Sequence, residues 1–366
     1  VERSRGLGDV YKRQLLPFAT RISIWRSSTC RHFLVGRLGK GDIDFSRRLV
    51  CILFHARPGY SRYGTLTTEA MPGLSPFLPA LQLPARVCTN CGFWQRFSGV
   101  PQSCPICLDS RHVPPMEGWE FRSFEEARER YPCHMEELLS GIFRIWNDPV
   151  EGIGPNCYLC TSESGNFLFE GTTVFSSEIL ERIRELGGVS FVSSSHPHSY
   201  GALWQIEEVF KPELIMHPED YSWAGAFQVT WPFDDSLQFT ERFSVLHSGV
   251  HFAGHTFAFD KQNEICFCGD SLKFKCSKES PRTARSVSSH KAFVRGVPIT
   301  REEASQYHQV FSRIQFSKTF TPFEQVFNFG YREALKLFDL FQNGRPSSEF
   351  VSLELLQESN NHDHNI

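Results

Sequence analysis

Hydrophobic and polar positions change their period several times between residues 145 and 345, and these changes predict alternating strands and helices. Residues 156–171 alternate around a polar turn, which predicts two short strands. Residues 176–188 follow with apolar positions three and four apart, serines at the start and two glycines at the end, which predicts a helix. The apolar run 189–192 then predicts a buried strand.

The same mixture continues toward the C-terminus. Residues 264–268 form an apolar run that predicts a strand ending at Gly269–Asp270. The sequence T-R-E-E at 300–303 fits a capping box and opens a helix. A last strand and a terminal helix that stops near Gly344 complete the pattern. Strands and helices mixed in this order predict a fold of the α+β or α/β class.

Length and composition allow about two domains of an ordinary globular protein. The chain has 366 residues, of which 40% are hydrophobic and 22% charged. No apolar run approaches the roughly 18–20 residues that cross a bilayer, so we expect no membrane span. The net charge of −3 argues against nucleic acid as the main partner, and a small-molecule substrate is the expected partner.

The first 70 residues differ from the rest in charge. They hold thirteen Lys or Arg against five Asp or Glu, and Met71 is the first methionine of the chain. A transit peptide has such a basic, acid-poor composition. The absence of a clear amphipathic helix favours the alternative, a disordered or non-native leader ahead of a start at Met71.

Twelve cysteines are spread too unevenly for a disulfide framework, which favours a reducing compartment. We therefore expect a cytoplasmic protein, or an organellar one if residues 1–70 are a genuine transit segment.

Two C-x-x-C pairs separated by twelve residues stand out. Such pairs form two knuckles whose thiolates complete a tetrahedral site for one metal ion. The four residues are Cys88, Cys91, Cys104 and Cys107. Structural zinc is the commoner use of this arrangement, since it stabilises a segment too small for a core. Gly92 and Pro105 resemble a rubredoxin-like knuckle, so redox iron stays the alternative.

These patterns divide the chain into five parts. We expect the leader at 1–70, a zinc-ribbon or rubredoxin-like module at 71–112, a connector with helical content at 113–144, the main domain at 145–345 and a polar tail at 346–366.

The strand at 189–192 leads into two histidines on either side of a proline. Pro197 fixes its own φ and pushes His196 into the extended region, so that His196 and His198 are offered from a stiff loop. The carboxyl end of a strand is where sites on such sheets are usually built. Two histidines in this arrangement can bind a single ion.

More candidate ligands follow downstream. Residues 246–259 bring three histidines, His247, His251 and His255. Asp270 places a carboxylate at the end of another predicted strand.

At these residues the chain resembles the metallo-β-lactamase superfamily. That family has an αββα sandwich and draws its metal ligands from H-x-H-x-D-H, from a histidine in a glycine turn, from a strand-end aspartate and from a C-terminal histidine. The resemblance covers roughly residues 145–345. It implies His196 and His198 as first ligands, His251 as third ligand with His255 in reserve, and Asp270 as the aspartate. The expected fold is thus a four-layer αββα sandwich preceded by a small zinc-ribbon-like module.

The chain departs from the family pattern at the groups that hold a second metal. Tyr200 and Gly201 replace the aspartate and the last histidine of the first motif, and no histidine follows His308 until His362 and His364 in the expected polar tail. We therefore expect one zinc in the histidine site and one in the cysteine site, with iron possible in either. Asp270 is expected beside the metal, as ligand or as acceptor for its water. Two interpretations of Tyr200 stay open, a catalytic oxyanion donor or a residue that packs at the start of the next helix.

Three functions remain in competition on this basis. The first is a metal-dependent hydrolase with a mononuclear zinc site, acting on an ester, thioester or phosphodiester. The second is a redox protein with rubredoxin-like iron. The third is a non-catalytic binding member of the fold. Three histidines and an aspartate at matching intervals favour the hydrolase.

Overall fold

The computed structural model describes residues 22–26, 31–35, 83–150 and 152–358. The chain divides into two compact units, residues 1–64 and 65–366. The described part of the first is a hairpin of β1 (Ile22–Arg26) and β2 (Arg31–Val35). The rest of the expected leader lies outside the described residues.

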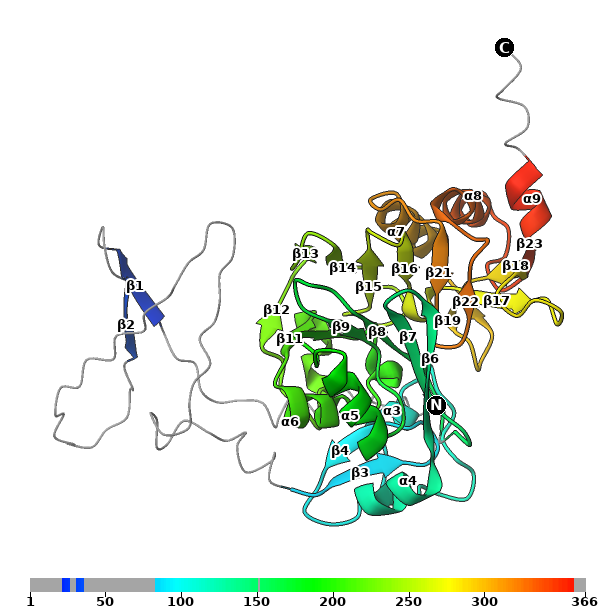
Figure 1. Cartoon of the computed structure of the whole chain (residues 1–366). Helices are drawn as coiled ribbons and strands as arrows, with labels where there is room; N and C mark the ends of the chain where they lie inside the picture. The colour runs from blue at the N-terminus through cyan, green and yellow to red at the C-terminus, as the bar shows by residue number, and fades with distance from the viewer. Residues whose placement is uncertain (1–21, 27–30, 36–82, 151, 359–366) are drawn as a thin grey trace, which may run out of the picture. The chain divides into compact units, whose positions relative to one another are not determined.

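Two large sheets form the body of the second unit (Figure 1). The first sheet has seven strands, in spatial order β12 (Trp231–Pro232), β11 (Glu213–Met216), β10 (Phe191–Ser193), β9 (Phe167–Phe169), β8 (Cys157–Cys160), β7 (Ile142–Asn147) and β6 (Cys133–Leu139). The second has six, in order β13 (Ser236–Gln238), β14 (Phe243–His247), β15 (Thr256–Asp260), β16 (Ile265–Phe267), β21 (Lys318–Phe320) and β22 (Gln325–Val326).

Four helices cover the outer faces of these sheets, α5 (Ser177–Glu185) and α6 (Leu203–Phe210) on the first and α7 (Arg301–Phe311) and α8 (Tyr331–Gln342) on the second (Figure 1). The remaining helices are α3 (Pro105–Leu108), α4 (Phe124–Arg130) and α9 (Leu353–Gln357), with single 3₁₀ turns η2 (Pro197–Ser199), η3 (Pro218–Trp223) and η4 (Gly269–Ser271). None of the described helices is long and apolar enough to cross a membrane.

Alternation along the strands separates the layers. In β8, Leu159 packs in the cluster that includes α5 and α6, whereas Tyr158 packs in the cluster between the sheets. In β16, Cys266 faces the cluster that contains α7 and α8, and Phe267 faces the interior between the sheets. Successive side chains of a strand point to opposite faces, so each sheet has one apolar face toward helices and one toward its partner. The four-layer αββα sandwich is confirmed.

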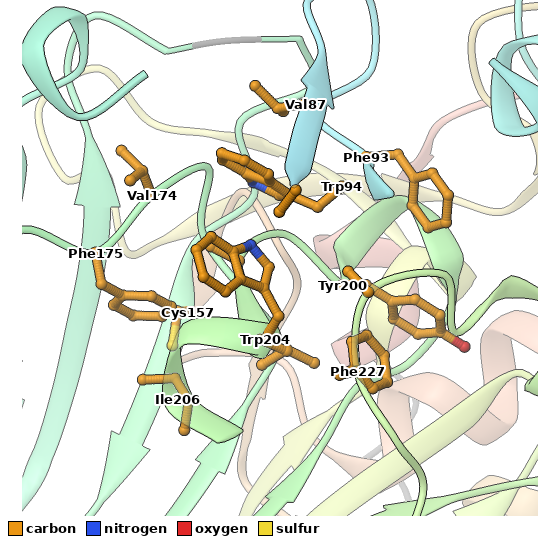
Figure 2. Close-up of a cluster of buried hydrophobic side chains, with 14 of the residues drawn as sticks. Val87, Phe93, Trp94, Cys157, Val174, Phe175, Tyr200, Trp204, Ile206 and Phe227 are labelled. Carbon is orange, nitrogen blue, oxygen red and sulfur yellow. The ribbon is translucent and has the colours of Figure 1, made fainter. Parts of the chain in front are cut away.

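Three small sheets surround the sandwich: β4 (Trp94–Arg96), β3 (Ala85–Cys88) and β5 (Phe121–Ser123); β17 (Lys273–Cys276), β18 (Ala284–Ser288) and β23 (Val351–Ser352); and the hairpin β19 (His290–Ala292) and β20 (Val297–Pro298). The first carries the cysteine module. It packs against the sandwich through Trp94, whose ring meets that of Trp204 edge to face at 5.4 Å (Figure 2). The indole of Trp94 also donates to the Thr173 carbonyl at 2.7 Å.

Two boundaries differ from the sequence-based expectation. The expected connector contains α4, as predicted, but also β6, the edge strand of the first sheet, and the start of its neighbour β7. The expected polar tail contains β23 and α9, because Val351, Leu353 and Leu356 are buried against the second half of the sandwich.

Candidate metal centre

Three buried histidines converge at the end of the sandwich. His196 stands three residues after the end of β10 and caps η2, which carries His198. His251 comes from the loop between β14 and β15. One ring nitrogen from each lies within 4.8 Å of those of the other two. The structure therefore brings together the three histidines that the sequence selected.

The ring nitrogens of this group fit a metal ion. The Nε2 atoms of His196, His198 and His251 are buried and have no hydrogen-bond partner among the described residues. Buried polar atoms are normally paired, so an unpaired cluster of this kind points to a ligand. Burial lowers the pKa of His196 to about 3 and also lowers those of the other two. All three are neutral near pH 7, the state in which imidazole binds metal.

Asp270 lies beside two of these histidines. Its Oδ2 is 3.5 Å from His196 Nε2 and 3.8 Å from His251 Nε2. The carboxylate is placed by η4, at the end of β16, as the sequence predicted. Gly269 allows this turn, since its φ is +52° and a Cβ there would lie 2.4 Å from the side chain of Ser195.

A buried carboxylate that the sequence analysis missed orients His196. The Oγ of Ser195 lies 2.7 Å from His196 Nδ1 and donates to Glu170 Oε1 at 2.5 Å. Glu170 Oε2 also accepts from the hydroxyl of Ser194 and the amide of Ser195. Burial raises the pKa of Glu170 to about 8; when its carboxylate is ionised and takes the Ser195 proton, His196 Nδ1 is the donor and its Nε2 is left free. Glu170 directly follows strand β9. A carboxylate at the end of an apolar run was therefore the sequence signal that could have identified it.

Other sequence candidates lie outside this group. His255 is buried with its Nδ1 on the hydroxyl of Ser248, and it does not belong to the triad. The ring of Tyr200 packs on Phe227 at 5.3 Å within a hydrophobic cluster (Figure 2). This placement favours the packing interpretation of Tyr200.

Gly201 explains one departure from the family pattern. Its φ is +43°, and an added Cβ would lie 2.2 Å from the carbonyl oxygen of Thr172. No ligating side chain fits at this position. The described residues offer three histidines that could hold one metal ion, and position 201 offers no further ligand.

The four cysteines form a separate group with the dimensions of a metal site. Cys88 Sγ and Cys107 Sγ are 3.7 Å apart, and Cys91 Sγ and Cys104 Sγ are 3.6 Å apart. An S4 tetrahedron with zinc–sulfur bonds of about 2.3 Å has edges of about 3.8 Å. All four thiols are free and buried. These distances fit a metal and are too long for disulfides.

A cavity of about 330 Å³ opens beside the histidines. His198, His251 and Asp270 form one side of it. Its other walls are mostly apolar, with four polar side chains; they are Arg111, His112, Ile153, Leu272, Lys273, Phe293, Val294, Phe323 and Glu324. None of these nine was selected from the sequence. Arg111 and His112 follow the last metal-site cysteine by a few residues, which was the only local signal for them.

Comparisons with known proteins do not identify an activity. No protein-family model matches the chain. An uncharacterized protein of Bacillus subtilis, YmaE, is 24% identical over 256 residues, which cover 67% of this chain and 90% of that protein.

The structural neighbours are metallo-β-lactamase-fold and flavodiiron proteins. The flavodiiron protein of Giardia intestinalis is 13% identical with a TM-score of 0.43, over 58% of this chain and 60% of its own. The metallo-β-lactamase FIM-1 of Pseudomonas aeruginosa is 11% identical with a TM-score of 0.42, over 58% and 95%. A metallo-β-lactamase family protein of Thermus thermophilus is 16% identical with a TM-score of 0.36, over 57% and 80%.

Proposed function

We propose that the chain is a metal-dependent hydrolase with one zinc ion at His196, His198 and His251 and a second, structural zinc at the four cysteines. The observation that supports this most directly is the convergence of three buried, unpartnered Nε2 atoms next to a carboxylate and a cavity. Three imidazoles leave one position of a tetrahedral zinc open, which is the arrangement of catalytic zinc sites.

A zinc ion held in this way lowers the pKa of its bound water to about 7 and polarises an oxygen of the substrate. The other functions fall to side chains of the chain. Asp270 is placed to accept a proton from the attacking water, since its carboxylate lies within 4 Å of two ligand nitrogens. Ser195 and Glu170 hold His196 in the tautomer that leaves Nε2 free.

The cavity limits the class of substrate. Its volume suits a small molecule, and the apolar walls at Leu272, Phe293 and Phe323 suit a group without charge. The proposed substrate is a small ester, thioester or phosphodiester that carries an apolar group. We propose no nucleic-acid partner, because the chain is slightly acidic overall.

Element-resolved metal analysis tests the two centres. Protein expressed from Met71 should contain two zinc ions per chain, and the His196→Ala/His198→Ala variant should contain one. His308→Ala is a matched control, because His308 pairs with Asp339 away from both centres and should keep both ions. A single zinc that the double substitution does not remove would refute the histidine assignment.

A substrate screen tests the activity. Ester, thioester and phosphodiester chromogenic substrates should be hydrolysed by the wild type and not by the double variant. Full metal occupancy with no hydrolysis of any of them would refute the hydrolase and favour the binding role. If metal analysis finds iron at the cysteines, that site is a redox centre and not a structural zinc site.

A further inference from the structure

Residues 109–113 connect the cysteine module to the histidine centre. They follow directly after Cys107 and helix α3. Arg111 and His112 line the cavity together with His198 and His251. This short segment therefore touches both metal groups, although the sequence places them in different parts of the chain.

The cysteine end of the segment is tied by one amide side chain. Asn90 Nδ2 lies 3.3 Å from Cys107 Sγ and donates to the Val113 carbonyl at 3.0 Å. The amide of Asp109 also bonds to the Ile106 carbonyl, which continues the turn of α3. The conformation of 109–113 thus depends on the knuckle that Cys104 and Cys107 form.

The histidine end is held by Arg111. Its guanidinium binds both carboxylate oxygens of Asp109 at 2.6 Å and donates to the His251 carbonyl at 2.9 Å. It also lies 3.6 Å from the centre of the Phe252 ring. The two bonds to Asp109 and the stacking on Phe252 leave the planar guanidinium little conformational freedom. Its bond to the His251 carbonyl therefore fixes the loop that carries the third ligand.

His112 makes the corresponding contact with the second ligand. Its ring lies 5.4 Å from that of His198. Its Nδ1 bonds to the Val113 carbonyl at 3.0 Å, and two nitrogens of Arg295 donate to its own carbonyl at 3.1 and 2.9 Å. These bonds fix both the ring and the backbone carbonyl of His112, and so keep the ring beside that of His198.

We propose that residues 109–113 couple the two centres, with Arg111 as a positioning residue for His251 and His112 as one for His198. The histidines then bind their metal tightly only while the cysteine module is assembled. This inference rests on the two metal centres of the proposed function. Supporting contacts around metal ligands commonly contribute 10–100-fold to metal affinity.

Metal competition on the full chain measures this coupling directly. Arg111→Ala and Asp109→Ala should each weaken metal binding at the histidines by about 10–100-fold while the cysteine site stays filled. The double variant should lose little more than either single variant, because the two side chains act as one unit. Arg182→Ala, which removes an exposed helix pair with Glu185, should leave the affinity unchanged.

Spectroscopy separates positioning from general loss of structure. With Co²⁺ at the histidines, the visible absorption bands should shift in Arg111→Ala. Arg111→Lys keeps the positive charge and should recover part of the affinity, and it also serves as the test variant where the alanine variant does not fold. Cys107→Ser should weaken the histidine site as well. Wild-type affinity in both Arg111→Ala and Asp109→Ala would overturn the coupling.

The outcomes distinguish the two proposals. If the wild type binds no metal at its histidines, the proposed function and the coupling both fail. If the wild type binds metal there and the Arg111 and Asp109 variants bind it equally tightly, only the coupling fails.

Discussion

Ser195 and His196 are neighbours in sequence and partners in a hydrogen bond, with Ser195 Oγ 2.7 Å from His196 Nδ1. The serine relays the buried Glu170 carboxylate to the imidazole. Glu170 and Ser195, which lie outside any metal motif, thus fix the His196 ligand through two consecutive hydrogen bonds. Such outer contacts fix ring orientation and raise ligand basicity.

Removing this relay should weaken the histidine centre without emptying the cysteine centre. We expect Ser195→Ala and Glu170→Gln each to lower the metal affinity of the histidines about 10–100-fold. Competition with a chromogenic chelator measures the change. Ser162→Ala is a suitable control, because Ser162 bonds to Ser164 in an exposed turn. Unchanged affinity in both relay variants would show that His196 is held by packing alone.

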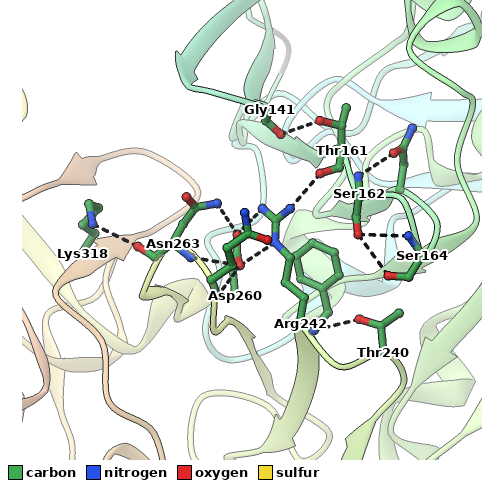
Figure 3. A network of polar contacts seen from close by, with 12 residues as sticks. Gly141, Thr161, Ser162, Ser164, Thr240, Arg242, Asp260, Asn263 and Lys318 are labelled. Atoms are coloured by element: carbon green, nitrogen blue, oxygen red, sulfur yellow. Dashed lines mark hydrogen bonds and ion pairs between the residues drawn. The ribbon is translucent and has the colours of Figure 1, made fainter.

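A second buried charge stabilises the sandwich itself (Figure 3). Arg242 donates to both oxygens of Asp260, at 2.7 and 2.6 Å, and to the Thr161 carbonyl at 2.8 Å. Thr161 follows β8 of the first sheet and Asp260 ends β15 of the second, so this arginine links the sheets.

Asp260→Ala should lower the free energy of unfolding by about 1.5–3 kcal/mol, because it removes both charge-assisted bonds of a largely buried ion pair and leaves Arg242 only its bond to Thr161. Urea denaturation measures the loss. Asp235→Ala provides the matched comparison, since Asp235 makes the same two-bond contact with Arg313 at an exposed position and should cost only about 0–1 kcal/mol. Equal losses in the two variants would contradict the role of burial.

The periodic elements could be predicted from the sequence because their core-facing positions recur within a few residues. Helix α5 begins after Ser176, whose side chain accepts from the amide of Ile179, as the capping pattern indicated. Strand β18 could not be recognised, because its sequence is polar and, of its two partner strands, β17 just precedes it whereas β23 lies more than sixty residues away. Its pairing depends on contacts that no local period records.

The candidate site divides in the same way. His196, His198 and Asp270 stand at strand ends, where sequence alone marks them. The contact of Arg111 with the His251 carbonyl joins residues 140 positions apart. Only the packing of the cysteine module on the sandwich creates that contact, so no spacing rule could have predicted it.

Asp220 makes the stability of the fold depend on pH. Burial raises its pKa to about 6, against about 3.9 in an unfolded chain, so the fold favours the protonated form. The stability from this group is complete below pH about 4 and is lost as the pH rises through 6. Asp220→Asn can still accept from the Gly254 amide. At pH 8 its free energy of unfolding, measured by urea denaturation, should exceed that of the wild type by about 2–3 kcal/mol, and at pH 4 the two should be equal. An equal increase in stability at both pH values would show that titration of Asp220 is not the cause.

Phe323 should set the preference for apolar substrates. It lines the cavity from the turn between β21 and β22 and is 44% exposed. Contact with a phenyl ring of this kind contributes about 1.5 kcal/mol or more. In Phe323→Ala, kcat/KM for a long-chain ester should fall about tenfold while that for an acetyl ester stays the same. Leu355→Ala, an exposed residue outside the cavity, should change neither value. Equal loss on both esters would place Phe323 outside the substrate contact.

Tyr200 decides between the two interpretations that the sequence left open. Its ring is 2% exposed and packs on Phe227 (Figure 2). It is not among the residues that line the cavity. Burial raises the pKa of its hydroxyl well above the usual value. A packed ring keeps its contacts in Tyr200→Phe, so we expect the stability and kcat/KM of this variant to stay close to those of the wild type. An oxyanion donor would instead cost about 10²–10³-fold in kcat. A loss of that size at unchanged metal content would restore the catalytic assignment. The control is Tyr158→Phe, which removes another buried hydroxyl from the interior between the sheets and measures the effect of a purely structural loss.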